Sequence, residues 1–156
     1  MRAILDELAD QAKATLGDRF PESAWPEALQ QAGPSGALGK VLRLWSASHP
    51  TPLVLLIDET DALADGLLAS TLRQLRAGHP SRPESFPLSV ALCGMRDVRD
   101  YPAGNSSPFN IAESMRLGDF TREETVALLG QHTAETGRTF EPRALATLWE
   151  QTRGQP

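Results

Sequence analysis

The sequence predicts an α/β fold in which a parallel sheet is flanked by helices. Leu53–Ile57 is an unbroken apolar run without charge, which is typical of a strand buried on both faces of a parallel sheet. A second stretch, Leu88–Cys93, which is apolar apart from Ser89, predicts a second strand. Between the two runs, leucines recur at helical spacing over about 62–77, which indicates the crossover helix that parallel strands require.

Length and charge narrow the class of protein. A chain of 156 residues suits one domain with a sizeable core, and its net charge of −5 argues against a broad electrostatic surface for nucleic acid. The first residues include Asp6, Glu7 and Asp10, too acidic for a signal peptide, and no apolar run approaches membrane-spanning length. The lone Cys93 excludes a disulfide framework, and we expect a buried, reduced thiol. We therefore expect a cytoplasmic protein.

Three helices are predicted ahead of the first strand. Apolar spacing indicates an amphipathic helix over 2–16 that ends at Gly17 and a shorter one over Pro21–Gln31. A third follows over about 36–48, with its apolar residues facing inward. No strand is predicted before residue 52.

The glycines and the final lysine of Gly33–Lys40 are similar to those of a phosphate-binding loop, but two other positions do not fit one. Pro34 stands where such a loop needs glycine, and Val41 stands where it needs the serine or threonine that meets Mg²⁺. Proline also removes an amide from a loop whose purpose is to present amides to phosphate. We interpret the segment as a turn that opens the third helix.

Two adjacent carboxylates, Asp58 and Glu59, follow the first predicted strand. Open α/β sheets bind ligands at the carboxyl ends of their strands. One carboxylate could hold Mg²⁺, and its neighbour could orient or deprotonate a water that attacks a phosphate. The plain alternative is that both are ordinary loop acids. For Asp61 we favour a helix N-cap over a chemical role.

The strand followed by Asp-Glu-Thr-Asp-Ala-Leu resembles the Walker B element of P-loop ATPases, above all the AAA+ class and its STAND-type members. This resemblance implies ATP and Mg²⁺ as cofactors, Asp58 as the metal ligand and Glu59 as the catalytic base. The string also fits the DExD box of helicases, but the other helicase motifs are missing. By order of elements the resemblance covers roughly 52–156. It implies a partial AAA+-like parallel-sheet core over 1–118, without its P-loop strand, and the start of a helical lid over 119–156.

The lid region has clear helix signals. Thr121 and Glu124 form a predicted capping box, and Pro142 suits the first turn of a second helix. The resemblance implies that Gly154 and Pro156 contact the bound nucleotide, whereas the plain alternative for the glycine is a helix C-cap. A third strand is expected near 112–117.

The end of the second strand departs from the family. Gly94 and Met95 stand where AAA+ proteins carry the polar "sensor 1" residue, which puts a standard sensor in doubt. Arg96 remains as a candidate phosphate contact, with a solvated arginine as the plainer alternative. Arg99 is a weaker candidate for an arginine finger, against an ordinary surface ion pair.

Two functions follow from these residues. The first is ATP binding and hydrolysis in a longer parent protein, of which this chain is a fragment that is inactive alone. The second is a degenerate, non-catalytic domain that serves as a protein-interaction or regulatory module. DNA binding rests on analogy alone, and the acidic charge counts against it. Open strand edges lead us to expect a protein partner, through self-association or pairing with the rest of the parent. From the apolar runs and the acidic charge we expect no membrane partner and no nucleic-acid partner.

Overall fold

The computed structural model describes residues 1–95 and 113–155. The chain divides into two compact units, Met1–Glu113 and Ser114–Pro156. None of the helices in the described part combines the length and apolar character that a membrane span requires.

Three helices open the first unit, as the periodicity predicts. They are α1 (Arg2–Leu16), α2 (Phe20–Ala32) and α3 (Ala37–Ser48). Gly17 ends α1 in the left-handed conformation, with φ of 68°, which glycine adopts without steric cost. One apolar face of each helix enters a common core, whose fully buried members include Leu5, Ala28, Leu38, Val41 and Leu42.

Within the described residues, the sheet of the first unit has two parallel strands, β1 (Val54–Ile57) and β2 (Ser89–Leu92). They pair in a register that sets Val54 beside Ser89 and Ile57 beside Leu92. The crossover between them is α4 (Asp65–Gly78), which lies between two short 3₁₀ helices, η1 (Thr60–Ala62) and η2 (His79–Ser81). A mixed α/β fold with a parallel sheet is therefore confirmed, although each described strand has only one partner.

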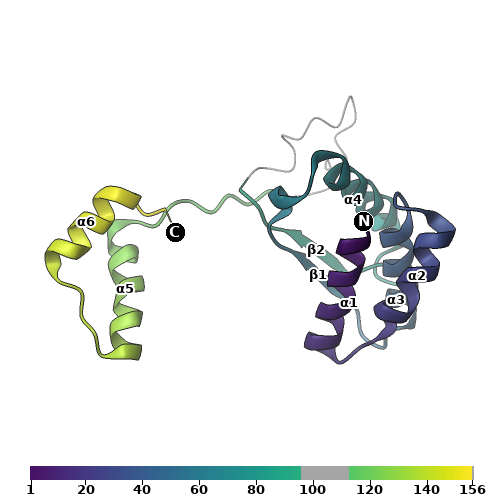
Figure 1. Cartoon of the computed structure of the whole chain (residues 1–156), viewed down its shortest axis with the longest axis horizontal. Helices are drawn as coiled ribbons and strands as arrows, with labels where there is room; N and C mark the ends of the chain where they lie inside the picture. The colour runs from purple at the N-terminus through teal and green to yellow at the C-terminus, as the bar shows by residue number, and fades with distance from the viewer. Residues whose placement is uncertain (96–112, 156) are drawn as a thin grey trace. The chain divides into compact units, whose positions relative to one another are not determined.

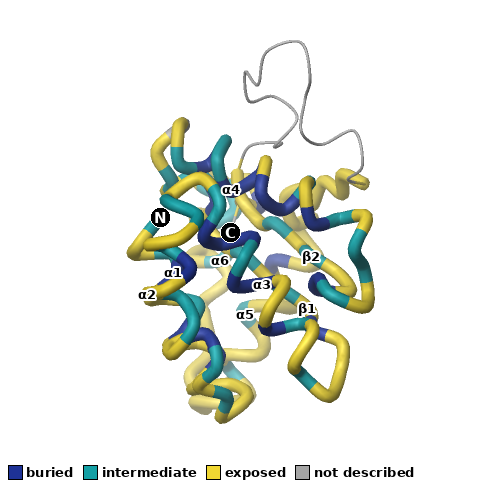
Figure 2. Tube along the Cα trace, turned by 90° about the vertical axis from the view of Figure 1, so that its right-hand side faces the viewer, coloured by how far each residue is buried: buried dark blue, intermediate teal, exposed yellow. Residues whose placement is uncertain are grey.

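The described residues cover only one face of this sheet. Leu55 and Ile57 pack against the core beneath the helices, whereas Val54 is 60% and Leu56 is 72% exposed. Figure 1 shows α1 to α4 on one side of the strands, and Figure 2 shows the burial that alternates along them. The prediction of a strand buried on both faces is therefore wrong. The apolar run does not distinguish a buried face from a solvent-exposed one, because both faces of β1 carry apolar side chains.

Two further predictions fail in the first unit and the segment after it. Cys93 was expected to be buried, but it directly follows β2 and is exposed. The third strand expected near 112–117 is not formed over the described residues 113–117, where Met115 and Leu117 face solvent. An apolar alternation alone does not make a strand without a neighbouring strand to bond.

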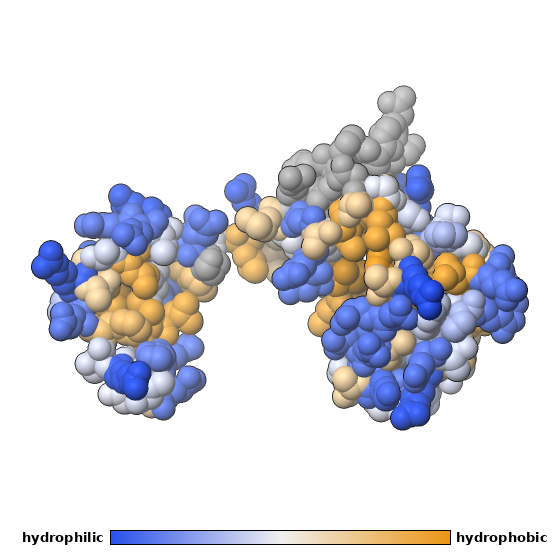
Figure 3. Space-filling view, viewed as in Figure 1, coloured by the Kyte–Doolittle hydropathy of each residue, from blue (hydrophilic) through white to orange (hydrophobic). Residues whose placement is uncertain are grey.

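The second unit is a pair of helices, α5 (Arg122–Thr136) and α6 (Pro142–Thr152). The predicted capping box is confirmed: the Glu124 amide donates to Thr121 Oγ1 at 3.2 Å, and the Thr121 amide donates to Glu124 Oε2 at 2.7 Å. Figure 3 shows apolar side chains gathered on this unit, and Val126 and Leu128 of α5 are exposed. Two helices alone do not bury the apolar residues that they carry.

Candidate functional site

The candidate site lies where β1 and β2 end, at the carboxyl edge of the sheet. Asp58 and Glu59 directly follow β1, and both side chains are exposed. The Glu59 amide donates to Asp58 Oδ1 at 2.8 Å, which holds the Asp58 carboxylate close to the turn. Because both acids face solvent, a cation could reach them without burial of an unpaired charge.

Glu59 has an unusual backbone conformation. Its φ of 52° and ψ of 41° lie in the left-handed region, and Arg153 is the other non-glycine residue of the described chain with a positive φ. For a residue with a Cβ this conformation costs roughly 1–2 kcal/mol, and glycine would avoid most of that cost. Such strain tends to cluster at functional sites, which makes Glu59 a residue to explain by chemistry.

Thr60 and Asp61 join the ends of the two strands. The amide and the hydroxyl of Thr60 both donate to the carbonyl of Cys93, each at 3.0 Å, and Thr60 is only 2% exposed. The Asp61 carboxylate accepts a hydrogen bond from the Met95 amide. These bonds extend the connection between the strands beyond the ladder, whose last bond runs from the Cys93 amide to the Ile57 carbonyl at 2.8 Å.

Asp61 is not the N-cap that we predicted. The N-cap of α4 is Ala64, and no side chain caps that helix. The physical reason is η1, which inserts a 3₁₀ turn between β1 and α4 and directs Asp61 toward the end of β2. The sequence did not reveal this bridge; the one available signal is a threonine and an aspartate directly after the paired acids.

Gly94 has a steric reason to be glycine. A Cβ built at this position would lie 2.4 Å from Thr60 Oγ1 and 2.7 Å from Asp61 Oδ2. No side chain fits at Gly94 while both bonds persist, so a polar side chain is sterically excluded at this position. Arg96 and Arg99, the candidate phosphate-binding residues after this strand, lie outside the described residues.

The segment Gly33–Lys40 is a turn that opens a helix, as we predicted. It connects α2 to α3, and the Gly39 amide donates to Gln74 Oε1 of α4 at 3.0 Å. Ala37 and Leu38 are buried in the core. An amide already bonded inside the protein does not contribute to a phosphate cradle, so this segment does not fit one.

The paired acids fit a shared metal better than a metal site made by the protein alone. Mg²⁺ prefers oxygen ligands, and it commonly takes one or two carboxylates together with waters and phosphate oxygens. Asp58 and Glu59 offer such oxygens at the surface. No group of three or more metal-ligating residues exists among the described residues. Asp58 and Glu59 are therefore candidate ligands of the oxygen type that Mg²⁺ takes.

Gly154, expected to contact nucleotide, has a structural role in the second unit. The Phe120 amide donates to the Gly154 carbonyl at 2.9 Å, and a Cβ on Gly154 would lie 1.9 Å from the Phe120 carbonyl oxygen. Its φ of 88° also favours glycine. This close approach of two backbones is sufficient reason for glycine here. Pro156 lies outside the described residues.

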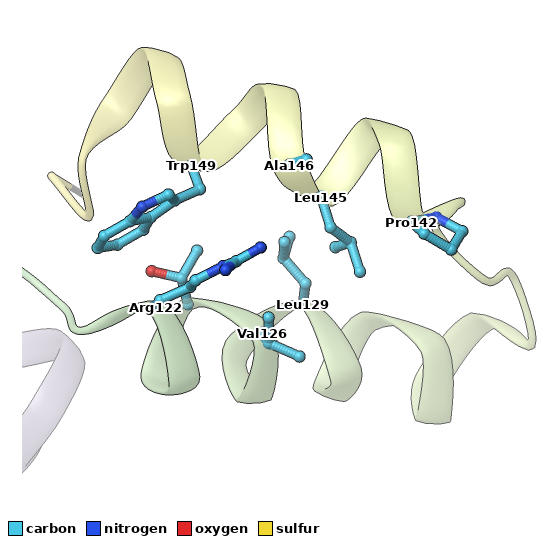
Figure 4. A pocket seen from close by; sticks show the side chains of 8 residues that line it. Arg122, Val126, Leu129, Pro142, Leu145, Ala146 and Trp149 are labelled. Atoms are coloured by element: carbon cyan, nitrogen blue, oxygen red, sulfur yellow. The ribbon is translucent and has the colours of Figure 1, made fainter.

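A hollow of about 190 Å³ lies between the two helices of the second unit. Figure 4 shows Trp149 and Leu145 of α6 pointing toward Arg122 and Leu129 of α5. Pockets for drug-sized ligands measure roughly 300–1,000 Å³, so this hollow is too small for a nucleotide. It is the partly filled core of a helical hairpin.

We compared the chain with protein-family models, with curated proteins and with solved structures, and none of the three comparisons gives a match. A functional assignment therefore depends on the residues at the strand ends. The structure brings Asp58, Glu59, Thr60, Asp61 and Gly94 together there. It assigns Gly154 to the second unit.

Proposed function

We propose that this chain is the Walker B and lid part of an AAA+/STAND-like ATP-binding protein. The observation that carries the proposal is the pair of exposed acids at the carboxyl end of β1, with Glu59 held in a strained conformation. The left-handed backbone of Glu59 lowers the stability of the fold, and such strain tends to occur at functional sites, which supports a role in chemistry. The parallel β1–α4–β2 arrangement is also the kind of sheet that binds ligands at this edge.

In this proposal the two acids have different roles in ATP hydrolysis. Asp58 would hold Mg²⁺, which would supply neutralisation of charge on the phosphate oxygens when bound. Glu59 orients the attacking water and accepts its proton as the water oxygen bonds to the γ-phosphorus. The bond from that phosphorus to the bridging oxygen breaks, and ADP leaves.

The proposal requires phosphate contacts from further polypeptide. The segment 33–40 is a helix–helix turn, and carboxylates without a phosphate cradle repel ATP. We therefore expect the isolated chain to bind ATP weakly and not to hydrolyse it. Hydrolysis is expected in a parent protein that supplies a phosphate-binding loop.

ATPase assays test both parts of the proposal. We expect hydrolysis by a protein extended upstream in its reading frame, with a loss of roughly 10²–10⁴-fold in Glu59→Gln. Glu84→Gln, at an exposed glutamate outside the site, is the matched control and should keep full activity. Equal rates for the extended protein and its Glu59→Gln variant would contradict the role of Glu59. Hydrolysis by the isolated chain that Glu59→Gln abolishes would contradict the predicted inactivity.

The exposed sheet face favours a second candidate, the non-catalytic interaction module. Val54 and Leu56 of β1 present large apolar side chains to solvent, and β1 has one described neighbouring strand. Exposed apolar patches and unpaired strand edges mark interaction surfaces. Asp58→Ala and Leu56→Ser separate the candidates: nucleotide effects lost in Asp58→Ala favour the ATPase. Self-association lost only in Leu56→Ser favours the module.

A further inference from the structure

The second unit has almost no core of its own. Among its described residues, 114–155, only Thr125 and Gly154 are buried, and neither carries a large apolar side chain. Leu129 and Trp149, which face each other's helix, are only partly buried. Chains of about 40 residues usually need a disulfide, a metal or a partner to fold stably. We therefore expect α5 and α6 to gain stability from a further apolar surface packed against them.

The hollow of about 190 Å³ between α5 and α6 is the place where such a surface would fit. An apolar cavity of about 150 Å³ accepts benzene, so this hollow has room for one aromatic or branched aliphatic side chain. Its lining is apolar apart from Arg122 and Thr125, and Figure 4 shows Trp149 and Leu145 pointing into it from α6. A pocket that takes one large apolar side chain is a common anchor point of protein–protein interfaces.

Arg122 gives the hollow a positive charge. It is the one charged residue among those that line the hollow, it is exposed, and it forms no ion pair with a described residue. Glu124, in the same turn of α5, is engaged in the capping box, where it accepts the Thr121 amide. The hollow is therefore complementary to an apolar side chain that has a carboxylate beside it.

We propose that this hollow docks an acidic amphipathic helix of another protein. One large apolar side chain of that helix fills the hollow, and a carboxylate one turn away binds Arg122. A helix suits the site because helical residues three or four positions apart point the same way, which brings the two groups together. The inference goes beyond the proposed ATP hydrolysis, since it assigns a partner to the second unit and uses none of the residues at the strand ends.

Three substitutions test the pocket and its charge separately. Ala146→Leu fills the hollow with a side chain of the protein itself and leaves Arg122 in place. Arg122→Gln removes the charge and keeps a polar side chain at the rim. Arg138→Gln is the matched control, because Arg138 is an exposed arginine of the same unit that does not line the hollow.

The experiment adds a helical peptide to the ¹⁵N-labelled full chain and follows the indole N–H signals of its tryptophans. The peptide is about 15 residues long, the length at which isolated helices begin to form, with leucines at helical spacing and a glutamate beside each leucine. We expect it to shift the signal of Trp149 and to leave those of Trp25 and Trp45, which belong to the first unit. A second peptide with lysine in place of each glutamate should bind more weakly.

The variants should lose affinity for the glutamate peptide to different extents. We expect Arg122→Gln to weaken binding roughly fivefold, the most that an exposed ion pair commonly contributes. Ala146→Leu should weaken binding at least about tenfold, because the apolar anchor loses its pocket. Arg138→Gln should bind like wild type. Hydrogen exchange of the Phe120 amide, which donates to the Gly154 carbonyl, monitors the helical hairpin in every variant.

Tighter binding of the glutamate peptide than of the lysine peptide, with the expected losses in Arg122→Gln and Ala146→Leu, supports the inference. A Trp149 signal that neither peptide shifts at millimolar concentration overturns it. Equal binding of the two peptides, or unchanged binding in either variant with an intact hairpin, overturns it as well. So does a Trp149 signal that moves with the concentration of the chain alone, which would place a second copy in the hollow. None of these results depends on ATP hydrolysis, so the proposed function stands or falls by its own assays.

Discussion

The indole of Trp45 donates a hydrogen bond of 2.6 Å to Oδ2 of Asp18, which joins the end of α3 to the turn between α1 and α2. The same carboxylate accepts the Phe20 amide on its other oxygen at 2.8 Å. His49 Nε2 lies 3.8 Å from Oδ2. Asp18 therefore links α1, α2 and α3 of the first unit.

This cluster predicts a pH-dependent stability. The Phe20 amide, then the Trp45 indole, and also the charge of His49, lower the pKa of Asp18 below its ordinary value of 3.8, although burial opposes them. The Asp18 carboxylate therefore stabilises the folded state above the unfolded-state pKa, and this stabilisation is lost as the pH falls through the lower folded pKa. Near neutral pH, Asp18→Asn should lower the free energy of unfolding by about 1–2 kcal/mol.

Urea unfolding over a pH series measures this effect. The gap between wild type and Asp18→Asn should narrow as the pH falls below 3.8, toward the folded-state pKa. Asp10→Asn, which changes an exposed acid of α1, is the control and should show no such narrowing. A gap that stays constant with pH would show that the charge of Asp18 contributes nothing.

A pair of glycine substitutions in α4 should have opposite effects. A Cβ on Gly78 would lie 2.0 Å from the buried ring of Phe86, so Gly78→Ala should cost about 1–3 kcal/mol of stability. Gly66, in the first turn of the same helix, has nothing within 4 Å of its added Cβ. Gly66→Ala should therefore raise stability by up to about 1 kcal/mol. Thermal unfolding of the two variants and the wild type measures these effects. A Gly78→Ala variant as stable as wild type would mean that the Phe86 ring can move aside.

Substitutions at Glu59 should separate strain from charge. Glu59→Gly removes the Cβ from a left-handed residue, and we expect a gain of about 0.5–1 kcal/mol after the entropy of glycine in the unfolded chain is deducted. Glu59→Gln keeps the strain and removes the charge, so its stability should stay close to wild type. Chemical denaturation of both variants provides the measurement. A loss of stability in Glu59→Gly would indicate that the glutamate side chain supports the fold.

The bare sheet face predicts concentration-dependent self-association. Leu56→Thr should reduce association in sedimentation velocity at little cost in stability, since Leu56 is already mostly exposed. Leu55→Thr is the matched control on the covered face. It should destabilise the fold, because Leu55 packs against the core. A monomeric wild type at high concentration would contradict this prediction.

The sequence predicted the local structure of this chain well. The strand positions, the three opening helices and the capping box at Thr121 follow from signals that lie within a few residues of one another. What covers the second face of β1 depends on distant parts of the chain, and four consecutive apolar residues read the same whether one face or both are buried. The exposure of Cys93 belongs to the same class of error, since it depends on where β2 ends and on what lies over it.

The candidate site was predictable only in part. Asp58 and Glu59 were recognisable from their place after an apolar run, and the structure confirms that place at the end of β1. The bridge from Thr60 and Asp61 to β2 was not, because it pairs residues more than thirty positions apart, Thr60 with Cys93 and Asp61 with Met95. The strain at Glu59 was also hidden, since a glutamate in the sequence gives no signal of a left-handed backbone.

The alternating burial of β1 determines which of its positions natural variation is free to change. In a chain that works with Val54 and Leu56 facing water, these two positions drift toward threonine, serine or lysine, while Leu55 and Ile57 remain apolar. In a chain that works with that face covered, all four remain apolar. A library of random variants selected for function would therefore report, through four neighbouring codons, whether this protein operates alone or against another surface.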